Sequence, residues 1–270
     1  MDKKCAPHKK YNNGSCFTTN DLVEIASDFN KQFPHKKIQI KDDKKYLLKN
    51  LTTAMKQNYD CDDQTCWIKQ SFIENKEIKK YTFRPLGPTK KFQWMSTSNI
   101  EDVMKQYEKK YTDFEFYGAV PYDFEELEYL PTYKFNVKNL NSSKKNQIGM
   151  VVNLDTHDKS GSHWVGLYIN RKKNQVYFFD SFGIKPGKRI SHFIKKFYNE
   201  MMSKGLTHDQ VDIRYNQKQH QFDNSECGVY SMNFIIRLLQ GESFDEITNN
   251  ITRDAEMNAN RGEYFRNFKH

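Results

Sequence analysis

Residues 163–180 read HWVGLYINRKKNQVYFFD, and this stretch decides the fold. Its two ends are short runs of β-branched and aromatic residues separated by the polar residues 170–174, which predicts two strands joined by a hairpin loop. Strands joined in this way lie side by side, so the residue that begins the first can neighbour the residue that ends the second. His163 and Asp180 hold those two positions. We therefore expect an imidazole and a carboxylate to meet at one edge of a sheet.

The sequence on both sides of this hairpin alternates between strand and helix patterns. Residues 148–154 and 211–215 are rich in β-branched and aromatic side chains and are predicted strands. Residues 190–202 carry apolar side chains at helical spacing, and residues 227–239 are apolar all round, which indicates a buried helix. Together these elements predict an α+β core with a central mixed sheet flanked by helices.

The N-terminal part of the chain has a different pattern. Residues 22–33 and 44–56 place apolar side chains at helical spacing. Residues 84–88 (RPLGP) then interrupt the helical pattern twice. We interpret residues 1–88 as a helical N-terminal arm and residues 89–270 as the core.

The composition limits the classes of function. The chain has 270 residues, of which 37% are hydrophobic and 14% aromatic, so it can build a packed core and is not a disordered chain. No run reaches the ~18 apolar residues of a membrane span, and the first residues lack the apolar stretch of a signal peptide. The net charge of +9 is compatible with an acidic partner such as nucleic acid. The lysines are scattered in pairs, however, which is also typical of a solvated basic surface.

The N-terminal cysteines allow two interpretations. Without a signal peptide we expect a reducing compartment, where cysteines are thiols, metal ligands or nucleophiles before they are disulfides. Cys5, His8, Cys16, Cys61 and Cys66 could supply the four nitrogen or sulfur ligands that zinc takes. The spacing from Cys5 to Cys16 is wide for a zinc knuckle. We therefore expect structural thiols that pack the arm, with no metal and no cofactor, and keep zinc as the alternative.

The fifth cysteine, Cys227, begins the buried helix. The positive end of a helix dipole stabilises a thiolate there, and a thiolate beside an imidazole is an activated nucleophile for acyl transfer. A carboxylate would hold that imidazole in the right tautomer and stabilise its protonated form. We predict Cys227 as the nucleophile, His163 as the base and Asp180 as the residue that orients the histidine. Each residue alone is a weak signal, because buried cysteines and histidines are commonly structural, and the combination carries the prediction.

Four pieces of sequence, in one chain order, resemble the signature of the SUMO-protease and adenovirus-protease clan of cysteine peptidases: His163-Trp164, Asp180-Ser181, Gln221 and Cys227-Gly228. Papain-type enzymes carry the cysteine first, so the order disfavours that family. The resemblance covers about residues 92–240 and implies a papain-like, SUMO-protease-like core.

Within this clan, the chain more closely resembles the maturation proteases of large cytoplasmic DNA viruses, such as that of African swine fever virus. The resemblance extends to the N-terminal cysteines, to residues 84–88 and to Ser225-Glu226-Cys227-Gly228. It implies a monomeric endopeptidase that cuts viral structural polyproteins after Gly-Gly during virion maturation. The expected location is the virion and the host cytoplasm, in the virus factory.

The resemblance also implies further site residues. Gln221 would donate its side-chain amide to the oxyanion hole beside the backbone N–H of Cys227, and Asn224 is the alternative donor. Trp94 and Trp164 would flank a narrow channel that admits only a Gly-Gly backbone, although both also fit as core aromatics. The sequence after Trp94 lacks the acidic part of the corresponding clan motif.

Two rival functions stay open. A SUMO or ubiquitin-like deconjugating protease would use the same triad but would need a large surface to dock a folded modifier. A basic nucleic-acid-binding scaffold with a vestigial site would use none of this chemistry, and four catalytic side chains retained in order argue against it. Basic charge could also accompany proteolysis if nucleic acid were a cofactor, as in the adenovirus enzyme.

Overall fold

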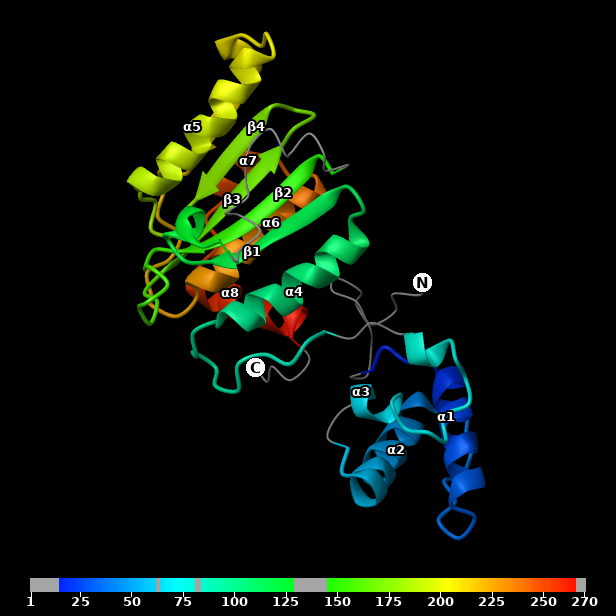
Figure 1. Ribbon diagram of the computed structural model, residues 1–270. Helices are drawn as coiled ribbons and strands as arrows, with labels where there is room; N and C mark the ends of the chain where they lie inside the picture. Colours follow the sequence, from blue (N-terminus) through cyan, green and yellow to red (C-terminus); the bar gives the residue numbers. More distant parts are fainter. Residues whose placement is uncertain (1–14, 62–63, 81–83, 129–144, 266–270) are drawn as a thin grey trace. The chain divides into compact units, whose positions relative to one another are not determined.

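The computed structural model describes residues 15–61, 64–80, 84–128 and 145–265. The chain divides into two compact units, Met1–Arg84 and Pro85–His270 (Figure 1).

The described part of the N-terminal unit is helical. Its elements are α1 (Thr19–Gln32), α2 (Lys44–Tyr59), the short α3 (Gln64–Trp67) and the 3₁₀ turn η1 (Ile78–Lys80). The helix α1 begins at a capping box, in which Thr18 and Asp21 each accept the backbone N–H of the other with their side chains. The apolar stripes of α1 and α2 face each other and enclose Trp67, so this unit has a hydrophobic core of its own.

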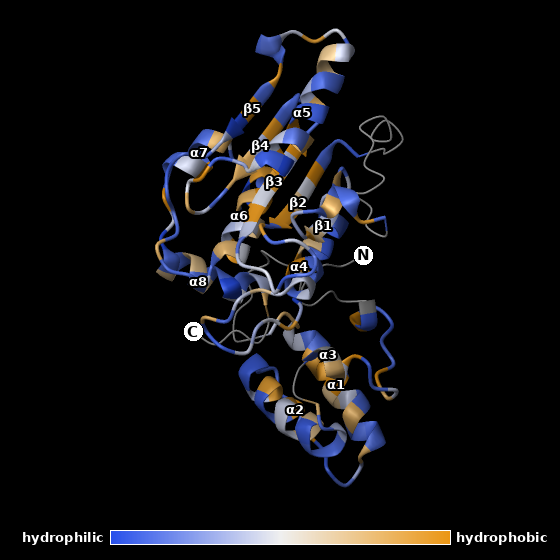
Figure 2. Cartoon of the chain, turned by 60° about the vertical axis from the view of Figure 1, so that its left-hand side comes forward, coloured by the Kyte–Doolittle hydropathy of each residue, from blue (hydrophilic) through white to orange (hydrophobic). Residues whose placement is uncertain are grey.

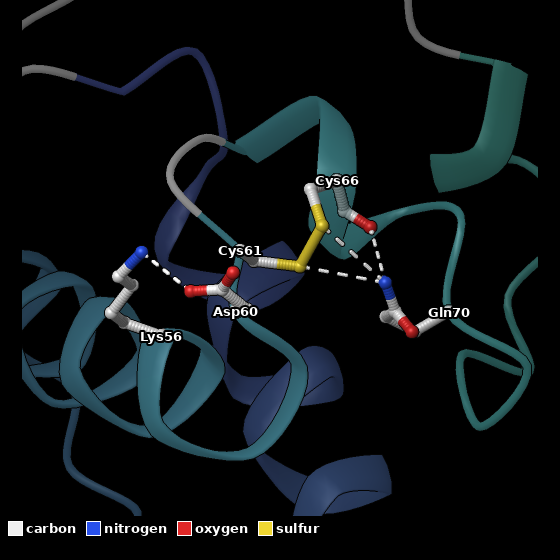
Figure 3. The surroundings of a disulfide bond; sticks show 5 residues. All are labelled: Lys56, Asp60, Cys61, Cys66 and Gln70. Atoms are coloured by element: carbon white, nitrogen blue, oxygen red, sulfur yellow. Dashed lines mark hydrogen bonds and ion pairs between the residues drawn. A yellow bond between two sulfur atoms is a disulfide. The ribbon is translucent and has the colours of Figure 1, made fainter.

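A disulfide joins Cys61 to Cys66, with the Cα atoms 5.4 Å apart (Figure 3). The side-chain amide of Gln70 points at the bond, and its Nε2 lies 3.4 Å from each sulfur. At the end of α2, Asp60 adopts a left-handed backbone conformation and pairs with Lys56 at 2.6 Å. This turn redirects the chain immediately before Cys61.

The prediction that the N-terminal cysteines are free thiols is therefore wrong for Cys61 and Cys66. Their Cα separation lies within the range that a disulfide spans, and neither sulfur can ligate zinc while it is bonded to the other. Cys16 is buried in the core of the same unit and is also disulfide-bonded, so the prediction is wrong for this residue too. Cys5 and His8 lie outside the described residues.

Five strands of the described residues form one mixed sheet in the spatial order β1-β2-β3-β4-β5. They are β1 (Phe114–Val120), β2 (Gln147–Asn153), β3 (Trp164–Asn170), β4 (Gln175–Phe179) and β5 (Asp212–Tyr215). The two outer pairs, β1 with β2 and β4 with β5, are parallel, whereas β3 is antiparallel to both of its neighbours. The predicted α+β fold with a mixed sheet is confirmed, and the hairpin of β3 and β4 lies at its centre.

Helices cover both faces of this sheet (Figure 1). The remaining elements are α4 (Thr97–Lys110), η2 (Phe124–Glu126), α5 (Lys188–Ser203), η4 (His208–Gln210), α6 (Cys227–Gln240), α7 (Phe244–Asn249) and α8 (Asp254–Tyr264). Apolar side chains of α4, α6, α7 and α8 form one core with one face of the sheet, and those of α5 form a second core with the other face. Figure 2 shows hydrophobic residues along the central strands and mixed colours along α5, as expected for an amphipathic helix that packs on one side.

Successive side chains of β3 point to opposite faces of the sheet and so belong to different cores. Trp164 and Tyr168 contact the α6 side, whereas Val165 and Leu167 contact the α5 side. Gly166 lies where α6 crosses the strand, and a Cβ there would stand 3.1 Å from the carbonyl oxygen of a residue of α6. The missing side chain lets α6 approach β3 closely.

The same contact fixes the start of α6. The hydroxyl of Ser231 donates to the carbonyl oxygen of Trp164 at 3.0 Å and to that of Cys227 at 2.8 Å. Because Trp164 begins β3 and Cys227 begins α6, the beginnings of the two elements are tied together.

Candidate active site

Cys227 is the first residue of α6 and is buried. It is the free thiol among the described cysteines. As a residue of the first helical turn, it has a backbone N–H without an acceptor inside the helix. The start of α6 therefore offers both a thiol and a hydrogen-bond donor.

His163 directly precedes β3, and Asp180 directly follows β4. The Nε2 atom of His163 lies 2.7 Å from Oδ1 of Asp180. Both side chains are largely buried, with exposed fractions of 11% and 3%. The ring of Phe182 stacks on the imidazole, with the centroids 4.6 Å apart and 16° between the planes. The imidazole is therefore held in one orientation.

The environment of His163 favours its protonated form. Burial alone lowers the pKa of its imidazole, but hydrogen bonds to Asp180 and Cys227, and attraction to their charges, raise the pKa to about 9. Since Nε2 is engaged by Asp180, Nδ1 is the ring nitrogen left for the thiol. The three residues predicted as a triad thus lie together in the order carboxylate, imidazole, thiol.

The backbone of Asp180 is held by a residue that the sequence analysis did not identify. Asn216, which follows β5, accepts the backbone N–H of Asp180 at 2.8 Å and donates to its carbonyl oxygen at 2.7 Å. The side chain of Asn216 is buried. An amide side chain just after a strand that neighbours β4 was the signal available in the sequence.

Gln221 is buried close to the same strand end. Its Oε1 accepts the hydroxyl of Ser181 at 2.6 Å, and its Nε2 donates to the carbonyl oxygen of Asp223 at 2.7 Å. A side-chain amide carries two N–H donors, so the bond to Asp223 uses one of the two hydrogens on Nε2. Asn224 is exposed, and its amide lacks this enclosed position.

The two predicted substrate-binding tryptophans line one groove of about 560 Å³, together with the loop of residues 153–162. Trp164 is only 8% exposed, and its Nε1 donates to the carbonyl oxygen of Met95 at 3.0 Å. Trp94 is 47% exposed. Trp164 is thus part of the packed wall, whereas Trp94 forms an accessible rim.

Gly228 makes this wall possible. A Cβ at Gly228 would stand 2.9 Å from the Cβ of Met95 and 3.3 Å from Cδ1 of Trp164. These distances are shorter than ordinary carbon contacts, so the groove wall packs directly on the helix backbone beside Cys227.

Among the described residues, no group of three or more histidine, cysteine or acidic side chains is placed to hold a metal ion. The same part of the chain contains no helix with the length and apolarity needed to cross a bilayer.

Known proteins are similar to this chain in sequence and in fold. The profile of the Ulp1 protease family, C-terminal catalytic domain, matches residues 129–269. The putative thiol protease R355 of Acanthamoeba polyphaga mimivirus is 37% identical over 97% of this chain and 93% of that protein. The SUMO-1 cysteine protease S273R of African swine fever virus (isolate Pig/Kenya/KEN-50/1950) is 22% identical over 82% of this chain and 90% of that protein. The crystal structure of the ASFV pS273R protease superposes with a TM-score of 0.62 at 20% identity, over 82% of this chain and 90% of that one.

Proposed function

The chain belongs to the Ulp1 protease family and is a cysteine peptidase, and from this premise we propose that it is an endopeptidase that cleaves viral structural polyprotein precursors after Gly-Gly during virion maturation. In this proposal Cys227 is the nucleophile, His163 the general base and acid, and Asp180 the orienting residue. The observation that carries it is the 2.7 Å hydrogen bond from His163 to Asp180 beside the free thiol of Cys227.

The proposed reaction follows from these positions. The Cys227 thiolate attacks the carbonyl carbon before the scissile bond, while the imidazolium of His163 holds the transferred proton. The N–H of Cys227 and the amide of Gln221 stabilise the oxyanion. His163 then donates its proton to the departing amine, which leaves a thioester on Cys227. A water molecule, deprotonated by His163, hydrolyses this thioester, which releases the carboxylic acid product and restores the Cys227 thiolate beside the His163 imidazolium.

The proposed specificity for glycine requires the groove that Trp94 and Trp164 line to lead to Cys227, and the packing of Met95 and Trp164 on Gly228 brings its wall beside that residue. In this proposal the two indoles narrow the approach to Cys227, which leaves room for a peptide backbone but not for a Cβ with further atoms attached. Glycine also adopts extended and positive-φ conformations without steric strain. We therefore propose glycine at both positions before the scissile bond.

The relatives support a viral setting. The two proteins compared above come from a mimivirus and from African swine fever virus. We propose that this chain acts as a monomer in the virion and in the host cytoplasm, at the virus factory. Its net charge of +9 would favour contact with nucleic acid during assembly.

Residues 1–88 are proposed to bind substrates or partners rather than to take part in the chemistry. The N-terminal unit has its own apolar core, and none of the proposed catalytic residues lies in it.

A second candidate is a protease that removes SUMO or a related modifier. The S273R relative is named a SUMO-1 cysteine protease. The exposed Phe222, next to Gln221, offers an apolar contact for a folded modifier. Such an enzyme would use the same triad, so the substrate decides between the two candidates.

The test is a substrate panel. The purified protein is incubated with candidate viral precursors, with SUMO and ubiquitin fusions, and with short Gly-Gly peptides, and mass spectrometry identifies each cut. We expect cleavage after Gly-Gly in precursors and peptides, with the fusions left intact. Cleavage of the fusions but not of the precursors would support the deconjugating protease. Cutting at sites without glycine would contradict both candidates. Parallel reactions with added DNA test the nucleic-acid contact.

A further inference from the structure

The face that α8 turns toward the rest of its unit carries three polar residues. Asp254, Asn258 and Arg261 are spaced at i, i+4 and i+7, which places them along one side of a helix. Asn258 and Arg261 are both buried. No pattern in the sequence assigns a role to any of the three.

Arg261 is fully buried, and its guanidinium contacts two other segments. It forms a bidentate ion pair with Glu226, from Nε to Oε2 at 2.8 Å and from Nη2 to Oε1 at 3.0 Å. Nη2 also donates to the carbonyl oxygen of Ser225 at 3.1 Å. Nη1 donates to the carbonyl oxygen of Gln93 at 2.7 Å. One side chain therefore bonds to both segments at once.

Glu226 is 1% exposed and receives two more hydrogen bonds. The hydroxyl of Ser225 donates to its Oε1 at 2.8 Å, and Nδ2 of Asn258 donates to the same oxygen at 2.9 Å. Nδ2 of Asn258 also reaches the carbonyl oxygen of Lys91 at 2.9 Å. The buried charge is thus paired and hydrogen-bonded, which is the condition under which a buried ion pair is tolerated.

The residues that Arg261 contacts are immediate neighbours of the proposed site. Glu226 directly precedes Cys227, and Gln93 directly precedes Trp94. The guanidinium therefore bridges the residue before the nucleophile and the residue before the groove rim.

The same face of α8 also reaches the loop that carries Gln221. The Oδ2 atom of Asp254 accepts the backbone N–H groups of Phe222 at 2.8 Å and of Asp223 at 3.0 Å. The carbonyl of Asp223 is in turn the acceptor for Nε2 of Gln221. The helix thus contacts the three segments that carry the nucleophile, the oxyanion donor and the groove rim.

We propose that Arg261 is a positioning residue, whose guanidinium fixes the distance between Trp94 and the sulfur of Cys227. It would thereby set the width of the glycine channel, the proposed passage for the substrate backbone between Trp94, Trp164 and Cys227. This inference rests on the proposed function, because it requires Trp94 to contact the substrate. Stability alone does not account for the pair, since well-packed apolar residues in place of a buried ion pair are often equally or more stable.

The shape of the guanidinium is essential to this role. Arginine presents a planar fork with five N–H donors, so one side chain can bind a carboxylate and a carbonyl in two directions. Lysine keeps the charge but concentrates its donors at one point. Arg261→Lys should therefore keep the attraction to Glu226 and lose the bridge to Gln93.

The test compares Arg261→Lys with a matched control, Arg237→Lys. Arg237 makes a similar pair with Glu242, from Nε at 2.9 Å and from Nη2 at 2.6 Å, near the other end of α6. The measurements are kcat and KM on a Gly-Gly peptide and on the same peptide with alanine before the scissile bond, and the rate of Cys227 alkylation by iodoacetamide.

We expect Arg261→Lys to reduce the preference for glycine over alanine about tenfold, which corresponds to ~1.4 kcal/mol. Alkylation of Cys227 should change less than about twofold, because the contacts of His163 with Asp180 and with the thiol are untouched. Arg237→Lys should leave both quantities unchanged. An unaltered glycine preference in a folded Arg261→Lys protein would overturn the proposal, and so would an equal loss in the control.

Asn258→Leu provides a second test if the lysine variant does not fold. This nearly isosteric change removes the hydrogen bonds of Asn258 to Lys91, three residues before Trp94, and to Glu226, while the bonds of Arg261 to Glu226 and Gln93 stay in place. The glycine preference should therefore change less than about twofold, and a tenfold loss would overturn the proposal, because Arg261 would then not be the residue that sets the channel width. A wild-type enzyme that cuts the two peptides equally would overturn the glycine channel and this inference together. A wild type that discriminates, with an unchanged Arg261→Lys variant, would overturn only the role of Arg261.

Discussion

Asp180 holds His163 through an oxygen that the backbone also fixes. Its Oδ1 accepts Nε2 of His163 at 2.7 Å and the backbone N–H of Phe182 at 2.9 Å. The carboxylate is thereby fixed to its own turn before it contacts the imidazole. The orientation of the ring depends on an acceptor at this position, and the charge of that acceptor is a separate contribution. Substitutions can distinguish the two contributions.

Removing the nucleophile should abolish cleavage. Cys227→Ala eliminates the thiol, and His163→Ala should be nearly as damaging because no base remains beside it; effects within one catalytic unit are not additive. Both variants should keep the melting temperature of a folded protein. His192→Ala, on the exposed face of α5, is the control and should keep wild-type turnover. Substantial turnover by purified Cys227→Ala would contradict the assignment.

Asp180→Asn should be milder than either change. An amide oxygen can still accept the N–H groups of His163 and Phe182, so the ring keeps its orientation and loses only the charge that stabilises imidazolium. We expect kcat to fall about tenfold, equivalent to ~1.4 kcal/mol. If the variant were as inactive as Cys227→Ala, the orienting role would be incomplete.

The same variant should shift the pH dependence. The imidazolium form persists below the raised pKa of His163, about 9, so the wild-type activity should decline as the pH rises through that value. Loss of the Asp180 charge removes a cause of the raised pKa, so the alkaline limb should move to lower pH. A histidine whose pKa is raised on folding also adds to the free energy of unfolding. This contribution is complete below the unfolded pKa of ~6.5 and is lost as the pH rises through about 9. Profiles of kcat/KM and of melting temperature against pH measure both effects.

Ser181→Ala should impair the oxyanion donor indirectly. The buried hydroxyl of Ser181 fixes Oε1 of Gln221 at 2.6 Å and thereby points Nε2 in one direction. Without it the amide can rotate, and we expect kcat to fall about tenfold with KM little changed, compared with ~10²–10³-fold for Gln221→Ala. Ser191→Ala is the control, because its hydroxyl makes an exposed hydrogen bond to Pro186. Equal kinetics of the two serine variants would refute this role.

Deleting residues 1–84 should raise KM more than it lowers kcat on a short peptide. These residues form one compact unit with its own core, and the proposed triad lies entirely in the other unit. Steady-state kinetics on a truncated protein with an intact melting transition provide the measurement. A truncation that folds but loses only kcat would contradict a binding role.

Local patterns predicted much of the fold and brought the candidate residues together. The two strand-like runs joined by the polar residues 170–174 placed His163 and Asp180 at one sheet edge. The apolar run from Cys227 onward located the start of α6. These features are readable because each depends on neighbours a few residues away.

Other features have little or no local signal. The strand β1 was not predicted because its register shifts between Phe116 and Ala119, so its burial does not alternate regularly. Asn216 and Arg261 reach partners about 35 residues away in the sequence, and such contacts follow from packing rather than from spacing. The disulfide of Cys61 and Cys66 was missed because the expected compartment was used to exclude it.

The glycine channel gives the sharpest prediction about substrate choice. Trp94 is half exposed, so Trp94→Ala creates no internal cavity, whereas truncating the buried Trp164 to alanine would destabilise the fold by ~3–5 kcal/mol. We therefore expect Trp94→Ala to lower the rate on Gly-Gly and to reduce the discrimination against alanine before the bond from ~10²-fold, about 2.7 kcal/mol, to about tenfold. Trp164→Phe keeps a ring in the wall and should have a smaller effect.

Phe92→Ala is the matched control for Trp94→Ala. Phe92 is 62% exposed, lies two residues before Trp94 and does not line the groove. Its removal takes away a similar exposed aromatic area without opening the wall, so the discrimination should stay at the wild-type value. Profiling a peptide library against the wild type and the three variants measures all of these ratios at once. If the wild type accepts large residues at the two positions before the cut, the tryptophans serve packing alone, because a channel of the proposed width cannot admit such side chains.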